Sequence, residues 1–235
     1  MTGAAFSDLL RSRAERANAS VEPEQIEQFQ KYFKLLASWN RRINLTALPL
    51  APPTEETIDR LLIEPLTAAR FVGSRRPFIR SEPGISNQSA IRNLQSAIPI
   101  WFDLGSGGGS PAIPMKIALP GLDLTMVESR SKKAAFLREV LRALEITSAS
   151  VENVRFQELS SDSMSVDYIT CRAVRTDSSL QTVAQRLLRH RGWLMTFSSS
   201  PRVEVFDGFE HVETVELFRG FLHVFARMFH VEQFG

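Results

Sequence analysis

The sequence predicts a doubly wound α/β protein with a mostly parallel sheet and an N-terminal helical extension. From residue 98 onward, short apolar runs alternate with amphipathic segments of helical period, which is the pattern of strands joined by helical crossovers. A glycine-rich turn at 105–109 follows the first of these runs and precedes a helical segment. The last two apolar runs are separated only by residues 218–220, too few for a crossover, so we expect an antiparallel hairpin there.

Two amphipathic helices are expected before the sheet, at 22–40 and 54–70. Apolar residues recur in them at three- and four-residue steps: Ile26, Phe29, Phe33, Leu36 and Ala37 in the first, and Ile58, Leu61, Leu62, Leu66 and Ala69 in the second. Thr54, followed by two glutamates, is typical of a helix start, whereas Pro65 favours a kink or an end.

We expect one domain over residues 1–235, made of N-terminal helices (1–72), a surface insertion (74–97) and a cofactor-binding core (98–235). The insertion is predicted because serine, proline, glycine and asparagine dominate this stretch, which has little to bury. In the core, strands are expected at 98–104, 122–127, 149–154, 166–171, 193–197, 212–217 and 221–226, with helices at 112–119, 132–144 and 178–189.

Composition excludes several classes of protein. A net charge of +2 is too small for a tail-driven nucleic-acid binder, so any nucleic-acid contact must be a local patch. A single cysteine excludes an intrachain disulfide, and the histidines at 190, 211, 223 and 230 lack metal-site spacing, so we expect no metal. No signal peptide or membrane span is recognisable, and the cytoplasm is the expected location.

The glycine-rich turn is the strongest local signal. Its glycines are Gly105, Gly107, Gly108 and Gly109, and Ser110 stands where a dinucleotide site of the form G-x-G-x-x-G would need its third glycine. An acidic residue followed by G-x-G-x-G is typical of S-adenosylmethionine sites, and the carboxylate of Asp103 suits the ammonium group of that ligand. The alternative is a tight strand–helix turn that binds nothing.

Glu128 follows the second predicted strand. An acidic side chain at this position can accept hydrogen bonds from both hydroxyls of a ribose, as in dinucleotide sites. The alternative is a solvated carboxylate at a strand end. The glycine turn and Glu128 together therefore favour a nucleoside ligand.

Four segments, read together, carry a resemblance. They are Trp-Asn-Arg-Arg-Ile-Asn-Leu-Thr at 39–46; the turn at 102–109 continuing into Ile-Pro at 113–114; Glu-Ser at 128–129 with Lys-Lys and Phe-Leu at 132–133 and 136–137; and Asp167 with Cys-Arg-Ala at 171–173. The chain resembles the bacterial 16S ribosomal RNA (guanine-N7) methyltransferases, the glucose-inhibited division protein B family. The segment at 39–46 is far more specific than the glycine turn.

The resemblance implies the class I S-adenosylmethionine-dependent methyltransferase fold, with seven strands of which the last is reversed. It implies a monomer that acts on 16S rRNA or the 30S subunit and binds S-adenosylmethionine through Gly105, Ser110, Glu128, Phe156, Gln157 and Arg172. Gln157 replaces a residue that is commonly acidic in the family. Arg41, Arg42, Lys132, Lys133, Arg138, Arg142 and Arg175 are candidates for an RNA-facing basic surface.

Departures from the family pattern concern the half of the site that would face RNA. The family segment Arg-His-x-x-Asp-Ser reads here as Arg-Leu-Leu-Ile-Glu-Pro at 60–65, with Leu61 in place of the histidine and Glu64 in place of the aspartate. Ser198 lies where a lysine is expected after the fifth strand. The insertion at 74–97 is also unusual for the family.

The chemistry leaves alternatives open. Guanine N7 has a lone pair and no proton, so its methylation needs alignment and electrostatic placement rather than a general base. Cys171 is expected to be a buried structural thiol rather than a nucleophile, and Arg172 could be either a strand-end ion-pair partner or part of the cofactor pocket. The alternative functions are methylation of another RNA site or a small molecule, and a non-catalytic RNA- or ribosome-binding protein of the same fold.

Overall fold

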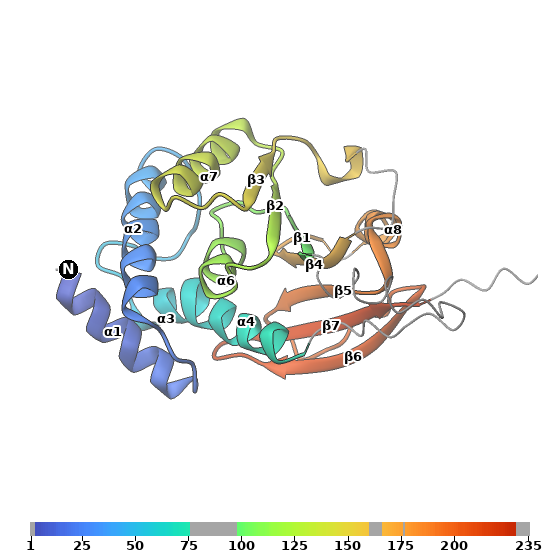
Figure 1. The fold of residues 1–235 in the computed structure, drawn as a ribbon, viewed down its shortest axis with the longest axis horizontal. Coiled ribbons are helices and arrows are strands. Elements are labelled where there is room, and N and C mark those ends of the chain that lie inside the picture. The colour runs from blue at the N-terminus through green and yellow to red at the C-terminus, as the bar shows by residue number, and fades with distance from the viewer. Residues whose placement is uncertain (1–2, 76–97, 160–165, 176, 229–235) are drawn as a thin grey trace, which may run out of the picture.

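The computed structural model describes residues 3–75, 98–159, 166–175 and 177–228. Its centre is a seven-stranded sheet in the order β3-β2-β1-β4-β5-β7-β6 (Figure 1). The strands are β1 Ile100–Leu104, β2 Asp123–Val127, β3 Ala149–Glu152, β4 Val166–Arg172, β5 Leu188–Ser198, β6 Phe209–Glu216 and β7 Phe221–Arg227. Strands β1 to β5 pair in parallel, whereas β7 runs antiparallel to both β5 and β6. The predicted fold class and terminal hairpin are confirmed.

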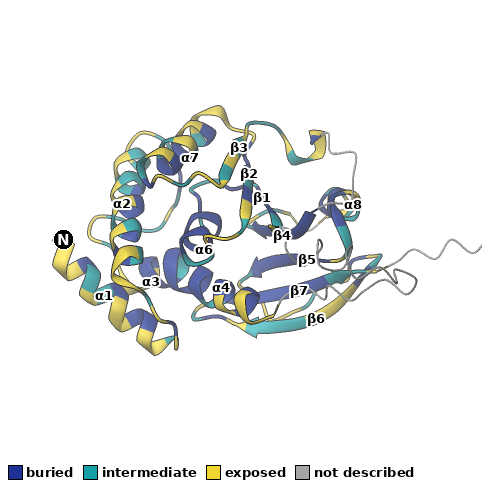
Figure 2. Cartoon of the chain, viewed as in Figure 1, coloured by how far each residue is buried: buried dark blue, intermediate teal, exposed yellow. Residues whose placement is uncertain are grey.

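Helices cover both faces of the sheet. On one face α6 (Ala112–Ala118) and α7 (Ser131–Ala143) pack with the N-terminal helices against residues such as Trp101 and Tyr168. On the other face α8 (Ser178–Leu187) packs against residues such as Ile169 and Leu194. Figure 2 shows the resulting buried layers on either side of the strands. This arrangement places the carboxyl ends of β1, β2 and β4 at one common edge, next to the point where the strand order reverses.

The N-terminal layer holds α1 (Gly3–Arg16), α2 (Pro23–Asn40), α3 (Glu55–Ile58), the π-helical turn η1 (Asp59–Ile63) and α4 (Glu64–Ser74). The helix predicted at 22–40 is confirmed as α2, and Thr54 caps α3 as expected by accepting a hydrogen bond from the backbone N–H of Thr57. Of the two outcomes expected for Pro65, a kink or an end, the structure excludes the end. The helix widens into η1 just before the proline and continues to Ser74.

Helix α1 was not expected from the sequence. It is anchored by Arg13, which is 2% exposed and donates hydrogen bonds of 2.7 Å to both carboxylate oxygens of Asp59. Arg219, in the β6–β7 turn, also donates to Asp59, at 2.9 Å. Asp59 therefore joins α1, η1 and the terminal hairpin.

Two further differences concern boundaries. Strand β5 begins at Leu188 rather than at 193, and helix α8 correspondingly ends at Leu187. The predicted insertion, apart from its first two residues, lies outside the residues that the structure describes.

Across the described ranges, no helix is long and apolar enough to cross a membrane. Within the same residues, no three His, Cys, Asp or Glu side chains are grouped so that they could hold a metal ion.

Candidate functional site

The glycine-rich turn follows β1 in the chain and is hydrogen-bonded to the carboxyl end of β2. The backbone N–H groups of Gly105 and Ser106 donate to the carbonyl oxygen of Val127, at 2.8 and 3.1 Å. The N–H of Gly107 donates to Oε2 of Glu128 at 2.9 Å, and Oε1 of Glu128 accepts from the N–H of Arg130 at 2.8 Å. The structure thus brings the turn and Glu128 together. A carboxylate offers about four acceptor positions, so Glu128 keeps acceptor capacity for a ligand.

Two glycines of the turn are required by the chain itself. Gly105 has a φ of +75°, and a Cβ there would lie 2.8 Å from Cγ2 of Val174. Gly109 has a φ of +86°, and a Cβ there would lie 2.9 Å from Cγ1 of Ile113. Any larger residue at either position would therefore meet backbone strain and a packing clash together.

A groove of about 690 Å³ lies beside the turn, at the ends of β1, β2 and β3. Gly105, Asn153, Phe156 and Gln157 are among the residues that line it. Phe156 is half-buried, whereas Gln157 is exposed and its side-chain amide donates to the hydroxyl of Ser179 at 3.3 Å. The volume is in the range of ligand sites, and the groove contains Phe156 and Gln157, which the resemblance assigns to S-adenosylmethionine binding.

Asn153 was missed by the sequence interpretation. Its side-chain amide donates to the backbone carbonyl oxygens of Glu128 and Ser129, at 2.8 and 3.1 Å. Asn153 therefore fixes the backbone that carries Glu128 at the groove. The turn-forming residue type just after a strand was the only available signal.

Asp103 is buried behind the turn, with 1% of its surface exposed. Its Oδ1 accepts a 2.6 Å hydrogen bond from the hydroxyl of Thr170, which in turn accepts one of 2.8 Å from the indole N–H of Trp101. Its Oδ2 has no partner among the described residues. Burial raises the pKa of Asp103 to about 6, against the opposing effect of the Thr170 hydrogen bond. A buried oxygen of this kind is costly unless a ligand donates to it, so it fits a cationic group such as an ammonium.

Arg172 lies at the end of β4, where its guanidinium contacts a carboxylate, a hydroxyl and an aromatic ring. Its Nη2 lies 2.5 Å from Oε2 of Glu64, and its Nη1 donates to the hydroxyl of Ser110 at 3.3 Å. Its guanidinium carbon lies 4.5 Å from the ring centroid of Phe197. Burial lowers the pKa of Arg172, and the nearby carboxylate of Glu64 opposes this shift. Arg172 therefore forms an ion pair, with Glu64, as one of the two alternatives from the sequence predicted.

The π-helical turn supplies two carbonyl oxygens to this cluster. Pro65 has no N–H to donate to the carbonyl of Leu61, four residues earlier, and the N–H of Glu64 bonds to Asp59 rather than to Arg60. The Leu61 carbonyl accepts instead from the hydroxyl of Ser110 at 3.0 Å, and the Arg60 carbonyl accepts from Nη1 of Arg172. The departure from the family sequence at 60–65 therefore shapes the site.

The motif at 39–46 contacts the glycine turn from the N-terminal layer. The side-chain oxygen of Asn40 accepts from the backbone N–H groups of Leu45 and Thr46, at 2.8 and 3.0 Å, and its amide donates to the Thr46 carbonyl at 3.1 Å. A Cβ at Gly108 would lie 3.1 Å from the carbonyl oxygen of Leu45. Tyr32 also donates to the Gly108 carbonyl, at 2.7 Å.

We expect Asn40→Ala to weaken S-adenosylhomocysteine binding about ten-fold, because the loss of these hydrogen bonds, each worth about 1 kcal/mol, releases Leu45 from the glycine turn. Isothermal calorimetry measures the affinity. Asn44→Ala, an exposed asparagine of the same segment, is the control and should bind like the parent. Equal affinity of the two variants would show that the motif does not support the turn.

The predicted residues therefore fall into two groups joined by the turn. Phe156 and Gln157 line the groove, and Glu128 lies between the lining residues Val127 and Ser129 with 6% of its surface exposed. Asp103 is buried, and Ser110 and Arg172 are partly buried, on the inner side of the turn. Trp39 packs on Phe136, with ring centroids 5.8 Å apart. Cys171 is buried, and burial raises the pKa of its thiol, which agrees with a structural role.

Because β7 runs against its neighbours in an otherwise parallel sheet, the fold is that of the class I S-adenosylmethionine-dependent methyltransferases. The glycine turn lies at the sheet edge where open α/β sheets bind their ligands. The sequence profile of the family described as rRNA small subunit methyltransferase G matches residues 85–224. The chain therefore belongs to this family.

Individual relatives carry the same family name. A ribosomal RNA small subunit methyltransferase G from Xylella fastidiosa is 34% identical over 175 residues, which are 74% of this chain and 69% of the relative. The protein of the same name from Leuconostoc mesenteroides is 27% identical over 212 residues, covering 88% of this chain and 78% of the relative. A solved S-adenosylmethionine-dependent methyltransferase from Aquifex aeolicus overlaps 60% of this chain and 90% of its own, with 12% identity and a TM-score of 0.45.

Proposed function

We propose that this chain transfers a methyl group from S-adenosylmethionine to N7 of a guanine in 16S rRNA, and that it does so as a cytoplasmic monomer. The observation that carries the proposal is the family membership, together with a glycine turn that the N-terminal layer and Glu128 hold in place. When bound, the methyl donor supplies a methyl group on a sulfonium sulfur, and the sulfur leaves as a neutral thioether when a lone pair attacks the methyl carbon.

The donor site is assigned from the residues present. Glu128 and the groove at 153–158 would hold the nucleoside, and the unpaired Oδ2 of Asp103 would accept a hydrogen bond from the ammonium group. Gly105, Gly107, Gly109 and Ser110 would form the turn around the ligand. Arg172 holds Ser110 and the Arg60 carbonyl on the inner side of the turn, and its guanidinium would donate hydrogen bonds to the acceptor edge of a guanine there.

The residues at the end of β4 argue against two other classes of acceptor and so leave N7 as the first candidate. This segment reads Thr-Cys-Arg-Ala at 170–173, which differs from the Asn/Asp-Pro-Pro-aromatic sequence of enzymes that methylate exocyclic amines. Cys171 is too buried to attack a cytosine ring. Methylation of another RNA site or of a small molecule is the second candidate. It is favoured by the replacements at Leu61, Glu64 and Ser198.

The test is mass-spectrometric mapping of methylated guanines in 16S rRNA from cells with and without the gene. We expect one 7-methylguanine to disappear with the gene and to return with the parent protein but not with Glu128→Ala. Purified protein should transfer labelled methyl groups to 30S subunits or to free 16S rRNA. An unchanged methylation map, with tight S-adenosylhomocysteine binding, would contradict the proposed acceptor and favour a non-catalytic protein.

The pKa of Asp103, near 6, predicts that affinity for S-adenosylhomocysteine depends on pH. The ligand's ammonium group needs the ionised carboxylate, so affinity should fall by about ten-fold for each pH unit below 6. Because the pKa is raised on folding, the native state binds more protons between about pH 4 and 6. The group's contribution to stability therefore falls as pH rises through that window.

Calorimetry at about pH 5 and pH 7.5, in buffers of different ionisation enthalpy, measures both the affinity and the proton released. Asp103→Asn keeps the acceptor for the Thr170 hydroxyl but removes the titrating group. We therefore expect this variant to bind weakly at both pH values. A parent protein with equal affinity at the two pH values would show that Asp103 does not contact the ammonium group.

A further inference from the structure

A groove runs along the outer side of α2, away from the ends of the strands. One hollow of about 330 Å³ lies between α1, α2 and the segment 50–53, and a second of about 390 Å³ continues it toward residue 41. The two hollows share Lys34, Ala37, Leu50 and Ala51, so we treat them as one feature, the α2 groove. The first hollow is also lined by Gly3, Phe6, Gln30, Phe33, Pro52 and Pro53, and the second by Ser38, Asn40 and Arg41.

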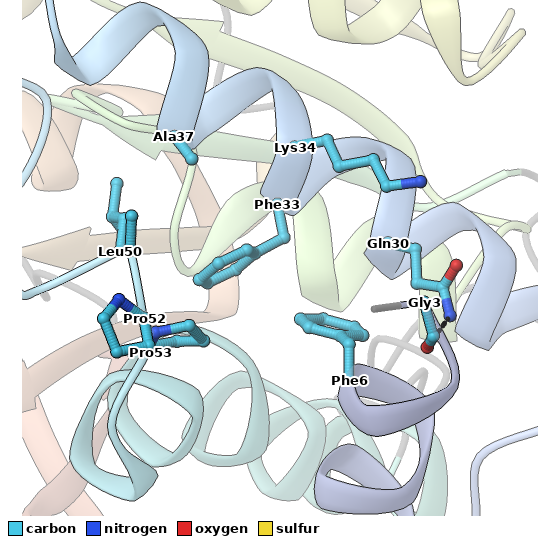
Figure 3. A pocket seen from close by; sticks show the side chains of 10 residues that line it. Gly3, Phe6, Gln30, Phe33, Lys34, Ala37, Leu50, Pro52 and Pro53 are labelled. Atoms are coloured by element: carbon cyan, nitrogen blue, oxygen red, sulfur yellow. Dashed lines mark hydrogen bonds between the residues drawn. The ribbon is translucent and has the colours of Figure 1, made fainter. Parts of the chain in front are cut away.

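The floor of the α2 groove is apolar and firmly packed. Figure 3 shows the rings of Phe6 and Phe33 opposite Pro52 and Pro53, with Lys34 and Gln30 at the rim. The two phenylalanine rings are 5.2 Å apart between centroids, and both side chains are largely buried beneath the hollow. Apolar side chains of this kind can contact the face of a nucleobase, and base stacking on such side chains does not depend strongly on sequence.

The charged residues that line the α2 groove are all cations. Lys34 and Arg41 are its charged lining residues, and no carboxylate of the described ranges lines it. Both cations are exposed, and neither makes an ion pair within the described residues. An apolar floor between unpaired cations complements a single-stranded nucleic acid, whose bases are flat and apolar and whose phosphates are anionic.

Helix α2, which forms one wall of the groove, also contacts the glycine turn through residues other than those of the groove floor. Tyr32, one residue before Phe33, donates to the Gly108 carbonyl, and Asn40 at the far end holds Leu45 against the same residue. The segment 50–53 leads into α3 and η1, whose carbonyl oxygens hold Ser110 and Arg172. Helix α2 and the segment 50–53 therefore link the groove to the residues around the proposed methyl-transfer site.

From this geometry we infer that the α2 groove binds the single-stranded rRNA next to the methylated guanine. A flanking base lies on the floor formed by Phe6, Phe33 and the two prolines, and the adjacent phosphates contact Lys34 and Arg41. This inference rests on the proposed function, since it concerns how the same RNA substrate is held.

The first test measures methyl transfer to unmethylated 30S subunits by Lys34→Glu, Arg41→Glu and Lys31→Glu. Lys31 is exposed on the same helix but does not line the groove, so it is the matched control. We expect KM for 30S subunits to rise about ten-fold for the first two variants and less than about two-fold for Lys31→Glu, with unchanged S-adenosylhomocysteine affinity. The slope of log KM against log salt should fall by about one for each lost phosphate contact. Equal effects of Lys34→Glu and Lys31→Glu would overturn the inference.

The second test blocks the floor without changing charge. Ala37→Trp places a large ring in the shared part of the groove, and we expect KM for 30S subunits to rise while S-adenosylhomocysteine affinity and the melting temperature stay those of the parent. A photoreactive benzoylphenylalanine at position 37 should crosslink to 16S rRNA in the 30S complex. Crosslinking only to a ribosomal protein, or normal kinetics of Ala37→Trp, would overturn the inference.

Failure of the proposed function would give a different result. If the parent protein bound S-adenosylhomocysteine but methylated neither 30S subunits nor 16S rRNA, the acceptor would be wrong whatever the groove does. Binding of protein-free 16S rRNA by the same variants then tests the groove alone. Equal binding by Lys34→Glu, Lys31→Glu and Ala37→Trp would exclude RNA as its occupant.

Discussion

Gly105→Asp is expected to abolish S-adenosylhomocysteine binding. The residue has a φ of +75°, a conformation that costs an L-residue about 1–2 kcal/mol, and its Cβ would lie 2.8 Å from Val174. Gly105 also lines the donor groove, so the change would put a carboxylate in that lining. The turn must therefore move, and the hydrogen bond from Gly107 to Glu128 moves with it.

Gly121→Asp is the matched control, because a Cβ at Gly121 meets no atom within 4 Å. Calorimetry should show the parent's affinity for this variant and no detectable binding for Gly105→Asp. Thermal melting of both proteins shows whether the fold survives. A folded Gly105→Asp protein that binds like the parent would mean that the ligand lies elsewhere, and the assignment of the donor site would be wrong.

The strands and the reversed hairpin could be predicted because their signals are local. Each strand is a short apolar run, and the four residues between β6 and β7 allow only an antiparallel connection. The positions of Gly105 and Glu128 followed in the same way, since parallel strands in sequence order end at a common edge.

Helix α1 was missed because its inward face includes an arginine. Phe6, Leu10 and Ala14 recur at four-residue steps, but Arg13 is as buried as they are. A pattern of apolar residues counts arginine as a surface residue. Only the tertiary contact with Asp59, 46 positions later in the chain, explains why it is buried.

Glu64 shows the same limit at the site. In the sequence it is a departure from the family segment, with no indication of a partner. The structure places it against Arg172, which is 108 positions away, and its side chain is 3% exposed. Pro65 gave a correct local signal of an irregular helix, but the consequence, two carbonyl oxygens turned to Ser110 and Arg172, depends on packing between the N-terminal layer and β4.

Arg172→Met is expected to end methyl transfer and to lower the free energy of unfolding by about 3–5 kcal/mol at neutral pH. The variant leaves the carboxylate of Glu64 buried without its cation, and Oε1 of that side chain already lacks a hydrogen-bond partner among the described residues. Burial raises the pKa of Glu64 even beside Arg172 and should raise it further without the arginine. The loss of stability should therefore shrink as pH falls, because the protonated carboxyl no longer carries the buried charge.

The double variant Arg172→Met/Glu64→Leu separates the two interpretations of Arg172. Replacing a buried ion pair by apolar side chains of similar volume is often neutral or stabilising, so denaturant unfolding should show most of the lost stability restored. Methyl transfer should nevertheless stay absent, because the two apolar replacements leave the Ser110 hydroxyl and the Arg60 carbonyl without the guanidinium that joins them. Recovery of methyl transfer together with stability would mean that Arg172 serves only to neutralise Glu64, and that the acceptor base is held by other residues.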